Sequence, residues 1–215
     1  MKIIDLTHTI EEKMPVFPGT PSPALTTSSF YEPDGFRETH LSLYSHNGTH
    51  MDAPAHVLKD GLTLDEMPVS QFAGKALVLD CCRLREKETI TMEIIRPCIG
   101  KAKEAEFLLF HLGWDRRWGK DSYFGEYPCL DDEVIEFILR TGKKGVGFDV
   151  LGPDPIPDES LSIHKKLLNA GNLVIIENLK NLEQCGNELF WFLALPLKWE
   201  NSDGAPVRAV GVWEE

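Results

Sequence analysis

The segment over residues 46–56, His-Asn-Gly-Thr-His-Met-Asp-Ala-Pro-Ala-His, combines three histidines and an aspartate with residues that limit the local backbone. Gly48 and Pro54 both disfavour a helix here, since glycine is too flexible and proline removes a helical hydrogen bond. The pair Asn47-Gly48 predicts a turn. Ala53 precedes a proline and is therefore biased toward extended backbone. We expect a turn followed by an extended run.

The polar side chains of this segment are expected to converge. Alternate side chains of an extended run share one side, which puts His50, Asp52 and His56 together. The preceding turn brings His46 back to the same place. Imidazoles with a carboxylate are a ligand set for Zn²⁺ or Mn²⁺. A lone histidine is usually a hydrogen-bonded core or surface group, but three at this spacing beside an aspartate indicate a metal site.

The same residues resemble a family signature. The order His-x-Gly-Thr-His-x-Asp-x-Pro-x-His is similar to that of the metal-dependent cyclase family, which includes the bacterial kynurenine formamidases and the isatin hydrolases. The resemblance extends from residue 5 to about residue 212. It implies one domain over residues 1–215 with a compact, swivelling β/β/α architecture of the α/β class, in which a mixed sheet is flanked by helices.

Hydrophobic patterning predicts the elements of such a fold. Apolar runs predict strands at residues 3–6, 75–80, 107–110, 146–149, 172–179, 189–197 and 207–213. Helices are expected at residues 89–100, 131–140 and 158–170, the first of them kinked at Pro97. Residues 40–46 alternate between apolar and polar, which predicts a half-buried strand that delivers His46 to the turn. His40 on its polar face is interpreted as a supporting or surface residue.

Two later residues complete the metal set that the resemblance implies. Glu177 follows four apolar residues, and an unpaired buried carboxylate is costly. His164 lies on the apolar face of the expected helix, where a histidine is usually a satisfied core residue. By resemblance, both bind metal. One ion then takes His46, His50, Asp52 and Glu177, and a second takes Asp52, His164 and Glu177.

The resemblance implies an enzyme, a formamidase-like amidohydrolase that cleaves an amide-type bond by metal-bound hydroxide. The implied activity is closest to that of an arylformamidase acting on N-formylkynurenine or a related small aryl amide. Two Zn²⁺ ions are expected, with Mn²⁺ as the alternative metal. His56 is the implied catalytic residue, a proton donor and acceptor, since imidazole titrates near neutral pH. The sequence has no Gly-x-Ser-x-Gly elbow for a serine nucleophile.

The expected substrate wall is the loop over residues 14–23, which holds four prolines and one exposed aromatic residue, Phe17. Such a stiff loop suits a pocket wall and is also an ordinary connector. In the kynurenine formamidases that the chain resembles, a tryptophan at this position lines the substrate site. The resemblance therefore implies that Phe17 is the substrate-binding residue. Gly152 stands where family members usually carry a serine. Both departures favour a substrate other than N-formylkynurenine.

Two alternatives remain open. The first is a hydrolase of the same family that uses one Mn²⁺ and opens a lactam or another cyclic amide, as an isatin-type hydrolase does. Glu177 favours the two-ion version over it, since a carboxylate supports a second cation. The second alternative is a non-catalytic protein in which the metal is structural or the site binds a ligand.

Charge and composition limit the partners. The net charge of −12 disfavours nucleic acid and anionic membrane surfaces as partners. The sequence contains no apolar run of about 18 residues, so we expect no membrane span. The N-terminus does not resemble a signal peptide, and the five cysteines lack a disulfide framework, so we expect a cytoplasmic protein with reduced thiols. Cys81, Cys82 and the strand-end residue His111 are interpreted as non-functional. The resemblance implies a homodimer or homotetramer that acts on a small molecule.

Overall fold

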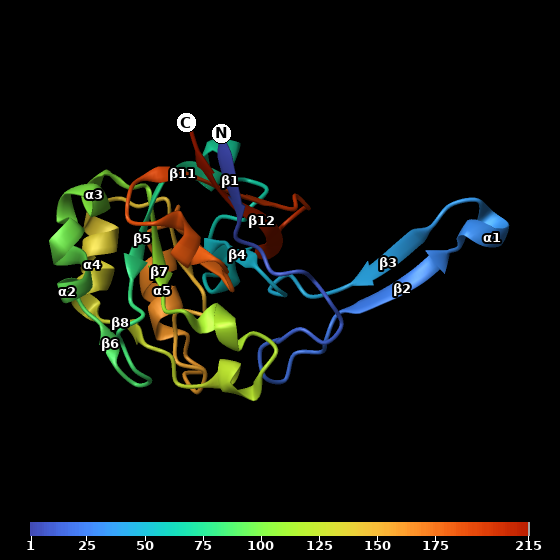
Figure 1. Cartoon of the computed structure of the whole chain (residues 1–215), viewed down its shortest axis with the longest axis horizontal. Coiled ribbons are helices and arrows are strands. Elements are labelled where there is room, and N and C mark those ends of the chain that lie inside the picture. Colours follow the sequence, from blue (N-terminus) through green and yellow to red (C-terminus); the bar gives the residue numbers. More distant parts are fainter. Residues whose placement is uncertain (215) are drawn as a thin grey trace.

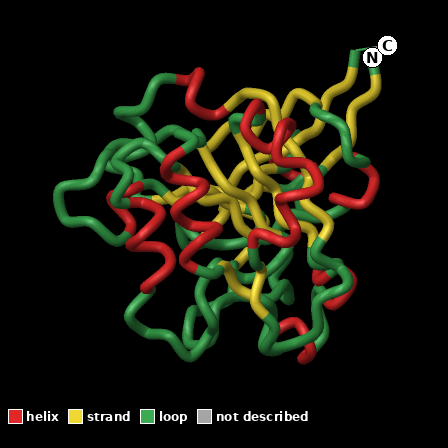
Figure 2. The backbone as a smooth tube through the Cα atoms, turned by 90° about the vertical axis from the view of Figure 1, so that its left-hand side faces the viewer, coloured by secondary structure: helices red, strands yellow, loops and turns green. Residues whose placement is uncertain are grey.

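The centre of the computed structural model, which describes residues 1–214, is an eight-stranded mixed sheet. Its strands follow the order β1, β12, β11, β5, β7, β9, β10, β4. Strand β4 also pairs with β12, so the sheet closes into a barrel-like arrangement at the middle of the molecule (Figure 2). The bounds are β1 Lys2–Asp5, β4 His50–Asp52, β5 Ala73–Asp80, β7 Phe107–His111, β9 Gly145–Phe148, β10 Val174–Glu177, β11 Phe190–Pro196 and β12 Gly204–Trp213.

Strands β5, β7, β9 and β10 form a parallel block inside this sheet. They are nearly continuous apolar runs because both of their faces are covered. Leu77 and Leu79 of β5 pack into the core cluster beneath the helices, whereas Ala76 and Val78 pack into the cluster on the other side of the sheet. The seven predicted core strands are confirmed, with small shifts of their ends.

The helices are short, and all but the first, which lies in a projecting hairpin, pack into the core cluster on one face of the sheet. In Figure 1, α2, α3 and α4 lie together on the left of the strands. The prediction for residues 131–140 is confirmed, because the Asp131 side chain accepts a hydrogen bond from the backbone N–H of Val134 at 2.8 Å and starts α4. The helix bounds are α1 Tyr31–Asp34, α2 Met92–Ile95, α3 Ile99–Glu104, α4 Asp132–Arg140 and α5 Ser162–Leu168.

Two predicted helices differ from the structure. In the first, residues 89–90 form a strand, and Pro97 lies in a 3₁₀ turn that separates α2 from α3. In the second, α5 begins at Ser162 instead of residue 158. The Asp158 carboxylate accepts hydrogen bonds from the hydroxyls of Ser160 and Ser162, and Leu161 adopts left-handed backbone with φ of 51°. These local bonds compete with the helix and delay its start.

A hairpin projects far from the body of the molecule. Strands β2 (Ala24–Ser29) and β3 (Glu38–Ser42) pair only with each other and are joined through α1, and we call them the arm (Figure 1). The predicted half-buried strand at residues 40–46 is therefore wrong. Strand β3 ends at Ser42, and all of its residues are exposed, including His40. Its apolar alternation has no partner surface within the chain.

The remaining two-stranded sheet pairs β6 (Thr89–Ile90) with β8 (Cys129–Leu130). Single-turn 3₁₀ helices connect the larger elements, at Pro54–His56, Val69–Phe72, Arg96–Cys98, Trp114–Arg117, Asp121–Phe124 and Leu182–Cys185. Within the part of the chain that the structure describes, no helix is long and apolar enough to pass through a bilayer.

Candidate metal centre

Two neighbouring strands carry the buried acidic and imidazole groups of the centre. Strands β4 and β10 pair antiparallel, with His50 opposite Glu177 and Asp52 opposite Ile175. Because His50 and Asp52 are two residues apart on a strand, their side chains lie on the same face. The side chains of His50, Asp52 and Glu177 are 3%, 1% and 7% exposed, so three polar groups share one buried space.

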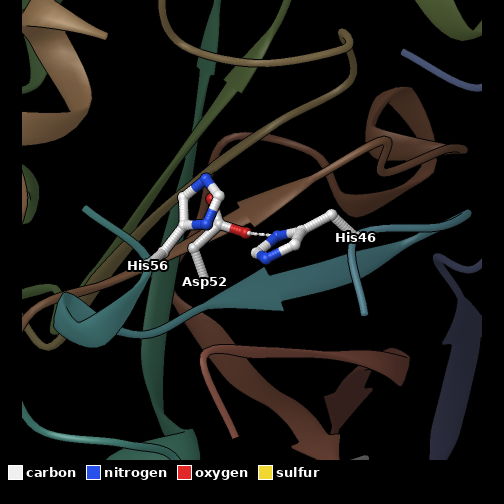
Figure 3. A group of neighbouring side chains, drawn as sticks. All are labelled: His46, Asp52 and His56. Carbon is white, nitrogen blue, oxygen red and sulfur yellow. Dashed lines mark hydrogen bonds and ion pairs between the residues drawn. The ribbon is translucent and has the colours of Figure 1, made fainter. Parts of the chain in front are cut away.

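The predicted turn before β4 is confirmed, and it returns His46 to the centre. Gly48 has a φ of 68°, a conformation that glycine adopts without strain. Nδ1 of His46 lies 2.7 Å from Oδ1 of Asp52, an interaction that a dashed line marks in Figure 3, and its Nε2 lies 2.9 Å from Oδ2 of Asp203. The imidazole is thus held between two carboxylates.

His56 reaches the centre by a different route from the one predicted. The extended run ends at Asp52, and Pro54–His56 forms a 3₁₀ helix, which proline initiates well because its φ is already helical. The turn swings the His56 ring to 4.0 Å from the His46 ring, between centroids, and both appear beside Asp52 in Figure 3. The convergence expected from strand alternation is therefore achieved by a helical turn.

Helix α5 contributes the last imidazole. Nε2 of His164 lies 3.0 Å from Oε1 of Glu177 and 3.4 Å from Oδ2 of Asp52. Its Nδ1 lies 2.6 Å from Oδ2 of Asp154. A carboxylate at Nδ1 fixes the imidazole with its proton there, which leaves the Nε2 lone pair directed at the other carboxylates.

The two central carboxylates each face both His50 and His164. Nε2 of His50 lies 3.3 Å from Oδ1 of Asp52 and 3.2 Å from Oε2 of Glu177. The other oxygen of each carboxylate faces His164. Two ligands on one tetrahedral ion with bonds of about 2.0–2.1 Å lie about 3.3 Å apart. These four spacings are therefore suited to metal ligation.

One buried atom shows that the centre suits a cation. Oδ2 of Asp52 is buried and accepts no hydrogen bond from the residues that the structure describes, although Nε2 of His164 lies 3.4 Å away. A buried carboxylate oxygen without a hydrogen bond is expensive. The Nδ1 of His50 is already used, since it lies 2.9 Å from the carbonyl oxygen of Gly48, so only its Nε2 faces the acidic groups. A metal ion would satisfy both the oxygen and the lone pair.

The charges around the centre also favour a bound cation. Burial lowers the pKa of His50, but hydrogen bonds and charge from Asp52 and Glu177 outweigh it and raise that pKa to about 10. For His46, burial is likewise outweighed by Asp52 and Asp203, and its pKa rises to about 9. The carboxylate field thus attracts positive charge. His56 differs, because burial outweighs Asp52 and lowers its pKa.

The four imidazoles of the centre and Glu177 line a cavity of about 400 Å³. Phe17 lies in its wall and is 47% exposed, alongside the apolar side chains of Leu151 and Ile156. Gly152 also lines it, and a Cβ there would lie 3.0 Å from Oε1 of Glu177, so the position is filled closely by that carboxylate. The expectation that His111 is not a ligand of this centre agrees with its position outside the cavity.

Sequence reasoning missed two carboxylates, Asp154 and Asp203. Asp154 follows Pro153 in an irregular segment after β9, and it also accepts the backbone N–H groups of Ile163 and His164 at 2.6 and 3.0 Å. Asp203 lies in the turn before β12. Polar turn residues are common, so neither position carried a signal for a role in the centre.

The sequence of the chain matches a known protein family. The family model described as "Putative cyclase" matches residues 4–155. A relative named kynurenine formamidase, from Bacillus cereus, is 31% identical over 216 residues, which cover 96% of this chain and 95% of the relative.

Solved structures resemble the whole chain. An isatin hydrolase bound to the product analogue thioisatinate matches with a TM-score of 0.87 at 23% identity, covering 100% of this chain and 93% of that one. A structure described as a potential metal-dependent hydrolase with cyclase activity has a TM-score of 0.78 at 26% identity, covering 98% and 96% of the two chains. The predicted cyclase-like α/β fold is confirmed.

Proposed function

Because this chain belongs to the cyclase family, we propose that its candidate metal centre hydrolyses the amide bond of N-formylkynurenine or a related small aryl amide. The chain is a metal-dependent amide hydrolase, the class to which its kynurenine formamidase relatives and hydrolase-like structural neighbours belong. The observation that carries the proposal is that Asp52 and Glu177 each face both His50 and His164. This cluster lies beside a cavity that can hold a small molecule.

Two divalent ions are proposed, Zn²⁺ in the first place and Mn²⁺ as the alternative. One would be held by His46, His50, Asp52 and Glu177, and the other by Asp52, Glu177 and His164. The donor spacings of 3.0–3.4 Å around His50 and His164 support this division. When bound, such ions would supply Lewis acidity, which activates water and polarises a carbonyl.

His56 is proposed to carry the proton. Its imidazole lines the cavity and is 24% exposed, so it reaches both solvent and substrate. Burial lowers its pKa, which keeps it neutral and ready to accept a proton at neutral pH. The departing amine of an amide must gain a proton, and the same imidazole is placed to return it.

The substrate class follows from the cavity wall. Phe17, Leu151 and Ile156 offer an apolar surface for an aryl group beside the acidic centre. Phe17 is proposed as the substrate-binding residue, since a ring at a cavity mouth gives large apolar contact with few torsions to restrict.

We also propose a homodimer or homotetramer, a single domain over residues 1–215 and a cytoplasmic location. The arm exposes large apolar side chains, including Phe30 at 57%, Tyr31 at 71% and Leu41 at 55%, which favours a covered state in an assembly. All five cysteines are free, which suits a reducing compartment.

The test is reconstitution of metal-free protein with Zn²⁺ or Mn²⁺, followed by assays with N-formylkynurenine and isatin. We expect hydrolysis of the formamide, and loss of both turnover and bound ions in Glu177→Ala. Faster opening of isatin with one Mn²⁺ would favour the cyclic-amide alternative. Metal binding with no turnover of any aryl amide would contradict the proposed function and favour a ligand-binding protein.

A further inference from the structure

A second group of metal-binding side chains lies away from the candidate centre, at the carboxyl ends of two parallel strands. Asp80 is the last residue of β5 and His111 the last of β7, and the two are directly paired in the sheet register. Cys82 follows Asp80 by two residues. These residues, with Glu183, line a separate cavity of about 460 Å³. Ligands of α/β sheets characteristically bind outside the carboxyl ends of the strands.

We propose that Asp80, Cys82 and His111 bind a Zn²⁺ ion at this site. One donor atom from each lies within 4.8 Å of the others. Sγ of Cys82 lies 3.5 Å from Nδ1 and 3.7 Å from Nε2 of His111, so the sulfur lies against the imidazole ring. A rotation of the exposed Cys82 side chain would let the sulfur and one ring nitrogen share a tetrahedral zinc ion, which holds such a pair about 3.5 Å apart.

A fourth donor would serve an ion held at Nε2 of His111, because Oε2 of Glu183, on the 3₁₀ helix at Leu182–Cys185, lies 3.9 Å from that nitrogen. His111 itself is 6% exposed, so its ring is held by packing, whereas Asp80 and Cys82 are open to solvent and give an ion a path in. The ion would tie the ends of β5 and β7 to the Glu183 segment.

The donor types select zinc over a hard cation. A thiolate with an imidazole suits Zn²⁺, while Mg²⁺ and Ca²⁺ prefer oxygen alone. A zinc ion binds cysteine as the thiolate, so binding at this site would release the Cys82 thiol proton.

Cobalt provides a test that does not depend on hydrolysis. Thiolate–Co²⁺ coordination gives a charge-transfer absorption, and no cysteine lines the candidate metal centre among the described residues. Reduced, metal-free full-length protein is titrated with Co²⁺ without oxygen. We expect the thiolate absorption in the wild-type chain and its loss in Cys82→Ser, which should still hydrolyse the formamide. This result is separate from the outcome of the function test.

Two further variants sharpen the assignment. Cys98→Ser is the matched control, because Cys98 lines the same cavity but its Sγ faces the carbonyl oxygens of Ile94 and Ile95, so the absorption should persist. Asp80→Asn retains an oxygen to accept the backbone N–H of Cys82, and should weaken Co²⁺ binding at least about tenfold. No thiolate absorption in the folded wild-type chain, or one that survives Cys82→Ser, would overturn the proposal.

Discussion

At the scale of single residues, Asp154 fixes the orientation and the tautomer of the His164 imidazole. Its carboxylate lies against Nδ1 of that imidazole and also accepts two backbone N–H groups at the start of α5. Asp154→Asn keeps an oxygen for the backbone but loses the charge that holds the imidazole tautomer. We expect metal affinity to fall about 10–100-fold, measured by competition with a chelator.

Asp158→Asn is the control for this variant. Asp158 lies in the same segment and caps Ser160 and Ser162, but it does not contact His164. Its replacement should leave metal affinity within about twofold. Equal metal affinity for Asp154→Asn and the wild type would show that His164 does not depend on this carboxylate.

The residues of the centre were predictable only where spacing carries the chemistry. His46, His50, Asp52 and His56 lie in one short segment whose turn and proline limit the backbone. His164 and Glu177 needed the family resemblance, since each alone reads as a core residue. Asp154 and Asp203 support histidines that lie 10 and 157 residues away in the chain. Contacts at such distances depend on the tertiary fold and leave no local pattern.

At the scale of elements, the segment after β1 is attached through His8. Its backbone N–H donates to Oγ1 of Thr49 at 2.9 Å, and its ring stacks on Trp118 with centroids 3.9 Å apart. Burial, with some repulsion from Lys180, lowers the pKa of His8 to about 4 from 6.5. Because the folded pKa is depressed, this residue's contribution to stability is present above pH 6.5 and is lost as pH falls through 4.

His8→Phe keeps the stacked ring and removes the titration. Urea unfolding of both proteins between pH 7 and pH 4 gives the difference in unfolding free energy. We expect that difference to be constant above pH 6.5. As pH falls from 6.5 toward 4, the unfolding free energy of the wild type should decrease relative to that of His8→Phe. A difference that does not change with pH would mean that the His8 imidazole is not buried against Trp118.

Strands were easier to predict than helices for a physical reason. Strands of the parallel block are buried on both faces, and their apolar runs follow from that burial. The start of α5 depends on Asp158 hydrogen bonds, which patterning does not detect. The arm was not predicted because its apolar residues are exposed in the structure. The alternation of apolar and polar residues alone suggested that one face of β3 is buried.

At the scale of the whole molecule, the arm predicts assembly. Replacing residues 25–41 with a short Gly-Ser linker removes the exposed aromatic residues of the arm but leaves every proposed ligand of the candidate metal centre. We expect the wild-type chain to be a dimer or tetramer and the shortened chain a monomer, measured by light scattering on a sizing column. A wild-type monomer, or an assembly that survives the deletion, would contradict this role for the arm.

If one buried cluster of imidazoles and carboxylates hydrolyses an amide while His56 moves the proton, the most direct test is hydrolysis of N-formylkynurenine by metal-loaded His56→Ala, beside the wild type and His8→Phe. We expect unchanged metal content, with kcat lowered about 10²–10⁴-fold in His56→Ala only. Undiminished turnover in that variant would contradict the role of His56 as the proton carrier.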